Sequence, residues 1–394
     1  MRVYFAPCGI GLGHVGRIVP IAKKLIKARS EVAFSTYRDG IRYIEHENLP
    51  LLKAPPIGFQ VKPDGSIDFR QTAVNPGPFF ASFTLLKQVN AEVNFIESFN
   101  PDVVVSDSRV SSLLAARLLG IPRICILNQF QIIVPRREHH LRLARLADSI
   151  ALTLIGKMWT SGNTVLIPDF PAPYTISLGN LYIPKSYRKN VKLIGPILET
   201  RPNELEDEET LRKKLELPAD KPTIFVPISG AIKEKAFLTG ILRKILLEFS
   251  EDYEIVMSLG YPDNDSKPIR HGNVTIFKWI PNRFEYLKAC DVIVARAGHG
   301  TITQAMCYGK PIILVPTPGH TEQINNAKQA RDLGVAKILL QKELSKETLM
   351  KTVKQILSVT DGKLKAIQQE VLQYDGVDDV VKTINGIAKN GQAF

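Results

Sequence analysis

Short apolar segments alternate with helical patterns along the chain, and this alternation restricts the fold more than any other feature of the sequence. Helical patterns occur at residues 19–26 and 111–119. Strands are expected at residues 2–7, 31–36, 103–105 and 121–127, and in a second series at residues 223–227, 254–259, 274–277, 292–295 and 312–316. Strands that alternate with helices build parallel, doubly wound sheets. We therefore predict an α/β fold.

The length of 394 residues exceeds what one hydrophobic core usually serves, so we expect two domains. The segment 193–197 has the composition of a seam, and an acidic run at 204–209 follows it. We place the N-terminal domain at 1–195 and the C-terminal domain at 196–376, each Rossmann-like. The last segment, 377–394, is expected to be a helix that packs back on the N-terminal domain.

The net charge of +12 belongs almost wholly to the first half of the chain. Residues 1–198 carry 24 Lys and Arg against 13 Asp and Glu, a net of +11. Such a surplus attracts an anionic membrane face, a lipid phosphate or nucleic acid, or it is an ordinary solvated surface. No aromatic-basic recognition motif supports nucleic acid as a partner.

The four cysteines have no metal-ligand spacing, and the sequence shows no signal peptide and no apolar stretch of about 20 residues. These features favour a cytoplasmic protein without a membrane span. The Asp263-Asn264-Asp265 triplet has the spacing of metal-dependent transferases, but its polar surroundings indicate a turn. We expect no metal and no cofactor.

A glycine loop follows the first strand and runs through Gly11, Leu12 and Gly13 to His14. Glycines let a backbone approach a ligand, and the N-terminus of the next helix favours a negative group. The spacing differs from the dinucleotide fingerprint. At the carboxyl edge of a sheet, His14 is either a general base or a capping and packing residue. Asp107 ends another strand at that edge. It either orients the His14 imidazole or caps the following helix.

A second strand, glycine turn and helix occur at 291–304 and include Arg296, Gly298, His299, Gly300 and Thr301. The helix start is suited to a diphosphate. The stretch 277–327 resembles the donor-binding signature of nucleotide-sugar glycosyltransferases, in particular the UDP-glycosyltransferase superfamily and MurG. The similarity extends more weakly over residues 1–36 and 101–130. It implies the GT-B fold, in which two Rossmann-like domains face a central cleft. The N-terminal domain would bind the acceptor and the C-terminal domain the nucleotide sugar.

The resemblance also implies roles for individual residues. His14 matches the family's catalytic histidine, and Asp107 matches the aspartate that pairs with it. Trp279 and Ile280 match the segment that holds the base, unless Trp279 is a core residue. The donor's phosphates and sugar would be bound by Ser229, Gly230, Arg296, Gly298, His299, Gly300, Thr301, Gln304, Glu322, Gln323 and Asn326. Glu322 can equally be a surface cap.

Two positions depart from the family pattern. Gln304 stands where the family usually has a glutamate on the ribose hydroxyls, which weakens the expectation of a particular nucleotide. Asn128-Gln129 lies near the position of a glutamate of the lipid II enzyme, which weakens the expectation of its acceptor chemistry. The expected donor remains a UDP-sugar.

The expected reaction is an inverting, metal-independent sugar transfer to an acceptor hydroxyl or phosphate. Two segments suggest a lipid or polyprenyl phosphate acceptor reached peripherally at an anionic membrane on its cytoplasmic face: the apolar segment 78–86 and the arginine-rich segment 136–155. The second can also be a packed helix between domains. The alternatives are a sugar-nucleotide 2-epimerase of the same fold and a non-catalytic nucleotide-sugar-binding protein. The sequence leaves the oligomeric state open.

Overall fold

The computed structural model describes residues 1–57, 77–128, 156–160, 164–181, 183, 185–230, 232–262, 267–358 and 362–391. It divides into two compact units. The N-terminal unit contains the described residues up to Leu198 and those from Tyr374 onward, and the C-terminal unit contains Glu199–Gln373. The chain therefore changes unit three residues after the predicted seam at 195 and returns three residues before residue 377.

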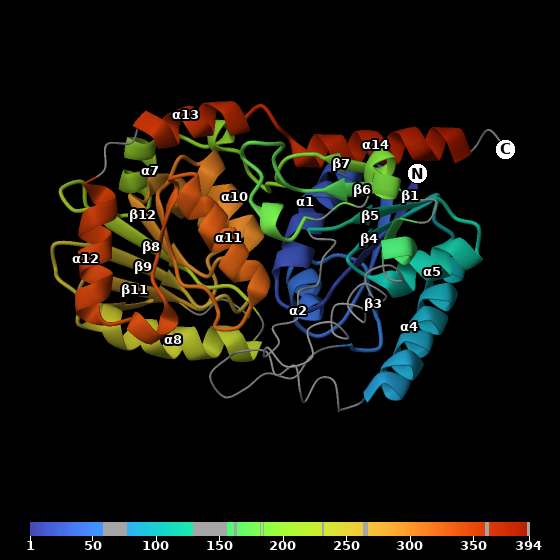
Figure 1. Ribbon diagram of the computed structural model, residues 1–394, viewed down its shortest axis with the longest axis horizontal. Helices are drawn as coiled ribbons and strands as arrows, with labels where there is room; N and C mark the ends of the chain where they lie inside the picture. Colours follow the sequence, from blue (N-terminus) through green and yellow to red (C-terminus); the bar gives the residue numbers. More distant parts are fainter. Residues whose placement is uncertain are drawn as a thin grey trace. The chain divides into compact units, whose positions relative to one another are not determined.

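The described part of the N-terminal unit contains a seven-stranded sheet of order β3-β2-β1-β4-β5-β6-β7, in which every pair is parallel (Figure 1). Its strands are β1 (Arg2–Pro7), β2 (Glu31–Thr36), β3 (Leu51–Lys53), β4 (Val103–Asp107), β5 (Arg123–Ile126), β6 (Thr164–Ile167) and β7 (Val191–Leu193). The central strand β4 is fully buried because its apolar run Val103-Val104-Val105 is covered on both faces.

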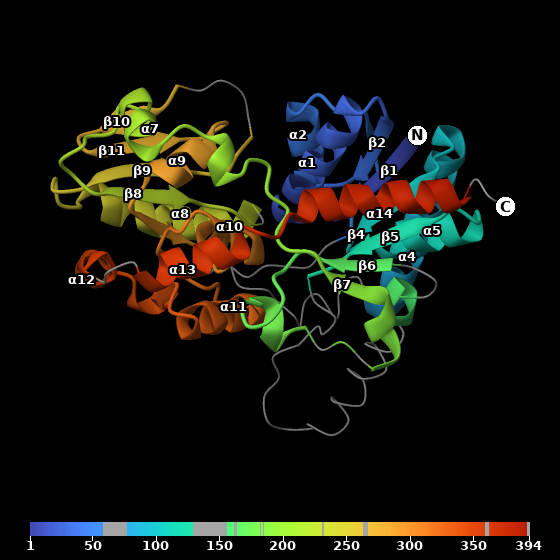
Figure 2. The same ribbon diagram turned by 90° about the horizontal axis from the view of Figure 1, so that it is seen from above.

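Helices cover both faces of this sheet. They are α1 (Gly13–Lys27), α2 (Asp39–His46), α4 (Gly77–Phe99), α5 (Val110–Leu118) and α14 (Gly376–Gly391). One core cluster joins Tyr4 and Val104 of the strands to Ile96 of α4 and Ala115 of α5. The C-terminal helix α14 packs against α1 and β4 and lies along the strands in Figure 2. Ion pairs from Lys24 and Lys192 to Asp378 and Asp379 hold its first turn.

The C-terminal unit contains, in its described part, a seven-stranded sheet of order β10-β11-β9-β8-β12-β13-β14. Its strands are β8 (Thr223–Pro227), β9 (Glu254–Ser258), β10 (Ile269–His271), β11 (Val274–Phe277), β12 (Val292–Ala295), β13 (Ile312–Leu314) and β14 (Ala336–Ile338). Only the exposed edge strand β10 is antiparallel to its neighbour among these described pairs.

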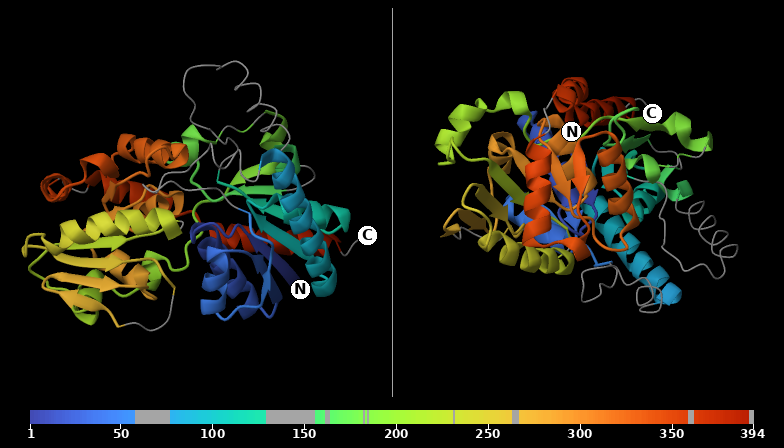
Figure 3. Two further views of the ribbon diagram at one scale, coloured as in Figure 1. Left: turned by 90° about the horizontal axis from the view of Figure 1, so that it is seen from below. Right: turned by 60° about the vertical axis from the view of Figure 1, so that its left-hand side comes forward.

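The helices of this unit are α7 (Glu208–Lys214), α8 (Ile232–Leu247), α9 (Arg283–Ala289), α10 (His299–Cys307), α11 (Thr321–Asp332), α12 (Lys346–Leu357) and α13 (Gly362–Val371). Leu238, Leu242 and Leu246 of α8 and Leu349 and Val353 of α12 pack on one face of the sheet. In Figure 3, α8 is the yellow-green helix along these strands. The described residues also include a helical segment at 156–160 and four short 3-10 helices: η1 (Ser177–Gly179), η2 (Lys185–Asn190), η3 (Pro202–Glu204) and η4 (Gln341–Glu343).

Both sheets confirm the predicted α/β class, with two parallel-sheet domains built in sequence. The parallel arrangement brings the carboxyl ends of the central strands of each sheet to one edge, where the loops that carry the candidate residues begin.

Candidate functional site

The glycine loop of the N-terminal unit joins β1 to α1 and is closely fitted to its surroundings. A Cβ atom at Gly9 would lie 1.7 Å from the carbonyl oxygen of Tyr37, so only glycine fits there. The Gly11 amide donates a hydrogen bond to Oδ2 of Asp39 at 3.0 Å. The buried Leu12 is the N-cap residue of α1, and Gly13 begins the helix. The loop therefore presents the first turn of α1 in a fixed position.

His14 lies in this first turn and contacts Asp107. The Nδ1 atom of His14 is 2.8 Å from Oδ1 of Asp107. Asp107 ends β4, which pairs directly with β1, and its side chain is fully buried, whereas 25% of the His14 side chain is exposed. Nη2 of Arg17 also lies 3.2 Å from Nδ1 of His14, but the carboxylate oxygen is closer and can only accept a hydrogen bond. We therefore assign the proton to Nδ1, which leaves the Nε2 lone pair of His14 as a proton acceptor.

Arg17 is a third member of this group that sequence reasoning missed. Its Nε donates to Oδ2 of Asp107 at 2.5 Å, and its Nη2 donates to Oδ1 of the same carboxylate. Its Nη1 donates to Oδ1 of Asn128, which follows β5. Arg17 stands three residues after His14, a spacing that puts both on one helix face. This three-residue spacing from the candidate base His14 was the sequence signal that could have identified Arg17 as part of the site.

Asp107 stays ionised in spite of its burial. Burial alone would raise the pKa of the Asp107 carboxyl, but the charges and hydrogen bonds of Arg17 and His14 lower it to about 2. The helix-capping alternative for Asp107 does not hold, since Arg109 occupies the N-cap position of α5 and the carboxylate bonds instead to His14, Arg17 and Ser108. Asp107 can thus orient the His14 ring and stabilise its protonated form.

A second buried charge network lies next to this group in the same unit. Arg109 forms an ion pair with Glu92 of α4, and both side chains are almost fully buried. Glu92 also accepts hydrogen bonds from the Tyr4 hydroxyl at 2.9 Å and the Ser35 hydroxyl at 2.6 Å. Because this network ties α4 to β1 and β2, it fixes the elements around the glycine loop and has a structural role.

The corresponding turn of the C-terminal unit joins β12 to α10. Gly298 is the N-cap residue of α10, and no acidic residue lies in the helix's first turn. His299 is buried, Thr301 is half-buried and Gly300 is exposed. The first N–H groups of a helix lack partners within it and favour a negative group, so this start can bind a phosphate.

Arg296 precedes this turn but is buried beneath it. Its Nη1 donates to the carbonyl oxygen of Val315 at 3.0 Å, and its Nη2 donates to Oε1 of Gln341 at 2.8 Å. Burial lowers the pKa of the Arg296 guanidinium to about 10, and the charge of Glu234 partly offsets this effect. The side chain therefore stays charged near neutral pH and braces the loops after β12 and β13.

Helix α11 connects the two loops predicted to bind the donor. Gln323 donates from Nε2 to Oε1 of Glu234 at 2.9 Å and accepts from the Thr317 amide at 2.9 Å. One turn later, Asn326 donates to the carbonyl oxygen of Ala297 at 3.4 Å. Glu234 stands in the first turn of α8, just after Ser229 and Gly230. The structure thus brings Gly230, Gln323 and Asn326 to one edge of the sheet and adds Glu234, which sequence reasoning missed.

Four further predicted residues lie around this edge. Trp279 follows β11 and is half-buried, with the Arg283 guanidinium carbon 6.0 Å from its ring centroid. Ile280 is buried. Gln304 of α10 and Glu322 of α11 are half-buried.

Several predicted features fall outside the described residues. They are Gln129, the triplet 263–265 and the arginine-rich segment 136–155. In the apolar segment 78–86, the side chains of residues 78–82 are also not described. In the described ranges, no three His, Cys, Asp or Glu side chains gather in a way that could hold a metal ion. No helix in the same ranges has the length and apolar character needed to cross a membrane.

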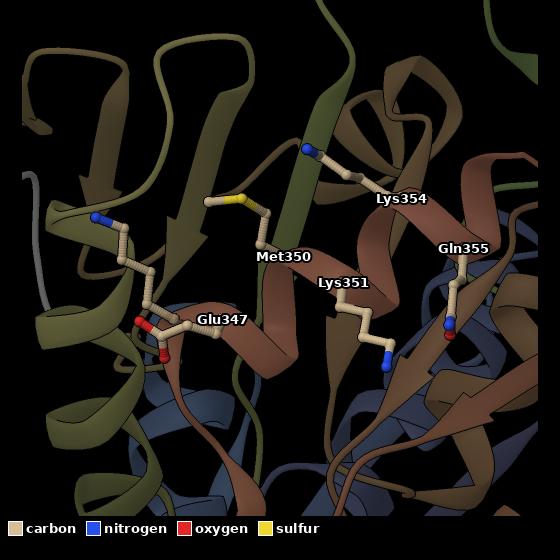
Figure 4. Close-up of a pocket in the computed structure, with 6 residues that line it drawn as sticks. Glu347, Met350, Lys351, Lys354 and Gln355 are labelled. Carbon is tan, nitrogen blue, oxygen red and sulfur yellow. The ribbon is translucent and has the colours of Figure 1, made fainter.

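A hollow of about 430 Å³ lies on the surface of the C-terminal unit (Figure 4). Its lining residues all belong to α12: Lys346, Glu347, Met350, Lys351, Lys354 and Gln355. None of the candidate residues described above takes part in it. The hollow therefore belongs to one helix surface and is separate from the loops predicted to bind the donor.

Comparison with known protein families agrees with this arrangement. Residues 1–199 match the model of Glycosyl transferase family 1, and residues 226–380 match the Glycosyltransferase family 28 C-terminal domain. The chain belongs to the GT-B glycosyltransferases. It is therefore an enzyme of the kind that the sequence resemblance predicted.

Individual glycosyltransferases resemble the chain over nearly its whole length. An uncharacterized glycosyltransferase of Methanosarcina mazei is 26% identical, covering 95% of this chain and 96% of its own. The UDP-N-acetylglucosamine–N-acetylmuramyl-(pentapeptide) pyrophosphoryl-undecaprenol N-acetylglucosamine transferase 1 of Bacillus cereus is 25% identical, covering 99% of this chain and all of its own. The crystal structure of Acinetobacter baumannii MurG matches the fold with a TM-score of 0.57 at 20% identity, covering 98% of this chain and 99% of its own.

Proposed function

We propose that this glycosyltransferase moves a hexosyl group, with inversion and without a metal ion, from a UDP-sugar to an acceptor hydroxyl or phosphate. The observation that carries the proposal is the contact between His14 and the ionised, buried Asp107 at the start of α1. A histidine with one nitrogen bonded to a carboxylate and the other available is suited to take a proton from an acceptor.

In the proposed reaction, Nε2 of His14 removes the acceptor proton as the acceptor oxygen attacks the anomeric carbon. The bond from that carbon to the nucleotide diphosphate breaks on the opposite side, which inverts the configuration. Asp107 stabilises the imidazolium, and Arg17 keeps Asp107 ionised. The first turn of α10 stabilises the charge of the leaving diphosphate through its N–H groups. An acceptor that is already an anionic phosphate needs no proton removal.

Support for a UDP donor and a lipid-linked acceptor comes from one similar protein and from charge. The name of the Bacillus cereus relative contains both UDP-N-acetylglucosamine and a pyrophosphoryl-undecaprenol. The net charge of +11 over residues 1–198 is suited to an anionic lipid surface. On α4, the exposed Phe83 and Leu86 lie beside Lys87, whose Nζ is 4.7 Å from the Phe83 ring centroid.

The experiment that tests the donor class is a thermal-shift screen with UDP, dTDP and GDP sugars, followed by product analysis. At a fixed concentration, a donor that binds more tightly raises the melting temperature more. We expect UDP-sugars to raise it most, and the product formed with an acceptor to have the inverted anomeric configuration. Formation of an epimerised nucleotide sugar from the donor alone would contradict the transfer reaction. Loss of turnover in excess chelator would contradict the metal-independent mechanism.

The lipid acceptor is tested separately by flotation. The protein should float with vesicles that contain anionic lipid at low salt and remain in solution with zwitterionic vesicles or at high salt. No binding to anionic vesicles at low salt would remove the lipid argument and leave the rest of the proposal in place.

A further inference from the structure

The carboxylate of Glu234 is a buried charge that the proposed reaction does not yet use. Its residue is only 6% exposed, although glutamate is rarely buried without partners. One oxygen, Oε1, accepts hydrogen bonds from Nε2 of Gln323 at 2.9 Å and from the Thr317 hydroxyl. These two bonds hold the carboxylate in one orientation.

The carboxylate as a whole lies beside Gly230, and its second oxygen is Oε2. A Cβ atom at Gly230 would lie 3.5 Å from Oε2, so the carboxylate lies directly against this loop, and Gly230 has a φ of +121°. Within the described residues, Oε2 has no hydrogen-bond partner. Oε2 is not one of the fully buried side-chain oxygens that lack a partner, so this oxygen is accessible although most of the side chain is buried. An accessible carboxylate oxygen held in one orientation can accept a hydrogen bond from a ligand.

The two helix starts at this edge differ in charge. The first turn of α10 contains no acidic residue, whereas Glu234 occupies the first turn of α8. The buried Lys235 beside it donates to the Gly260 carbonyl and lies over the Tyr261 ring. A carboxylate at the start of α8 repels a phosphate and already complements the positive end of the helix. The diphosphate is therefore better bound by α10, and the Ser229–Gly230 loop is better suited to a neutral donor of hydrogen bonds.

Helix α11 sets the spacing between these two places. Gln323 contacts Glu234, and Asn326 contacts the Ala297 carbonyl just before α10 begins. Gln323 and Asn326 are three residues apart, so the two contacts are separated along the helix by about one turn, roughly 5 Å. A sugar ring joined to a diphosphate extends over a distance of this order.

We propose that Oε2 of Glu234 accepts a hydrogen bond from a hydroxyl of the transferred sugar, and that Glu234 thereby determines which donor sugars the enzyme accepts. This inference rests on the proposed function, since it assumes that a nucleotide sugar binds the C-terminal unit. It assigns Gln323 a positioning role, because both ends of its side-chain amide are engaged with Glu234 and the Thr317 amide.

The test compares nucleotide and nucleotide-sugar binding in Glu234→Gln. Calorimetric titration uses UDP, UDP-glucose, UDP-galactose and UDP-N-acetylglucosamine, with dTDP and GDP counterparts. The substitution retains the side-chain shape and replaces one acceptor oxygen by an amide. We expect UDP to bind the variant within about twofold of the wild type, while the preferred UDP-sugar binds on the order of tenfold to a hundredfold more weakly, the range for a lost hydrogen bond to a charged group.

Deoxy-sugar donors give the second readout. In the wild type, removal of the contacted hydroxyl should weaken binding by about the same factor, and in Glu234→Gln the same removal should have little further effect. The matched control is Thr317→Val, which removes a bond to Oε1 but leaves Oε2 in place. It should retain the discrimination between the sugar and its deoxy analogue.

The outcomes separate the two claims. Tighter UDP binding by Glu234→Gln would show that the carboxylate faces the phosphates, and an equal loss for UDP and UDP-sugar would show a purely structural role. Either result overturns the role of Glu234. Failure of the folded wild type to bind any nucleotide sugar in the panel would instead overturn the proposed function.

Discussion

The glycine turns before α1 and before α10 have the same backbone arrangement, a strand followed by a turn and a helix, but they differ in their charged side chains. Each follows a buried strand and opens a helix with no acidic residue in its first turn. At α1, His14 and Arg17 converge on the buried Asp107. At α10, the exposed residue of the first turn is Gly300. The buried guanidinium of Arg296, just before this turn, donates instead to Val315 and Gln341. In the proposed function, this difference assigns the proton to the first turn and the anion to the second.

The largest effect expected from this comparison is on His14. His14→Gln should lower kcat/KM by about 10³-fold for a hydroxyl acceptor, because a positioned general base contributes roughly 10²–10⁴. UDP-sugar affinity and the melting temperature should stay close to wild type. Steady-state kinetics and calorimetry check this result. The matched control is His46→Gln on the exposed end of α2, which should retain wild-type activity. A His14 variant with wild-type kcat would exclude the base.

The next largest effect is on stability at Arg17. Arg17→Gln leaves the buried charge of Asp107 with His14 as its main partner, and loss of one partner of a buried pair costs about 3 kcal/mol or more. Urea unfolding should show this decrease in the free energy of unfolding, together with loss of activity. Arg17→Lys retains the charge but not the two-point contact, so it should recover only part of the stability. No change in either variant would mean that Arg17 does not hold Asp107.

The pH dependence of stability provides a third test. Because the pKa of Asp107 is lowered from 3.8 to about 2 in the folded protein, the unfolded chain binds more protons between these values. The contribution of Asp107 to stability is therefore complete above about pH 4 and is lost as the pH falls toward 2, amounting to about 2 kcal/mol. Urea unfolding at several pH values should show a smaller acid loss in Asp107→Asn than in the wild type. An identical pH slope in both proteins would contradict the ionised, paired Asp107.

Much of the fold could be predicted from the sequence, since runs of β-branched residues such as Val103-Val104-Val105 mark buried strands directly. The strands β1, β2, β8, β11 and β12 begin and end at the predicted residues. The short strands β3, β6, β7, β10 and β14 were missed, because segments of three or four residues carry little pattern, although the equally short β13 was found.

The candidate site was predictable only in part. His14 follows the glycine loop after β1 and Asp107 ends β4; both were found, and the structure brings them into contact. Arg17 and Glu234 were missed because a charged residue in the first turns of a helix is usually solvated. Their burial depends on Asp107 and Gln323, which are about 90 residues away in the sequence. The hydrophobic periodicity of a sequence gives no information on side-chain contacts between residues so far apart.

The smallest of the predicted effects concerns the first turn of α10. Gly300→Asp places a carboxylate where the proposed diphosphate binds, and a Cβ atom there meets no other atom within 4 Å. We expect UDP to bind roughly tenfold more weakly in calorimetry, while the melting temperature is unchanged or higher. Gly300→Ala is the control for size and should bind UDP nearly as well as wild type. Equal affinity in the wild type and Gly300→Asp would exclude this helix start as the phosphate site.

The central claim is that the two turns divide the work between proton transfer and donor binding. Its most direct test is to measure, on the same preparations, donor affinity and the single-turnover rate at saturating donor for His14→Gln and Gly300→Asp. The account predicts that His14→Gln loses rate at normal affinity and that Gly300→Asp loses affinity at a nearly normal rate. If both variants lose affinity and rate to the same extent, the two turns do not have separate roles and the account is wrong.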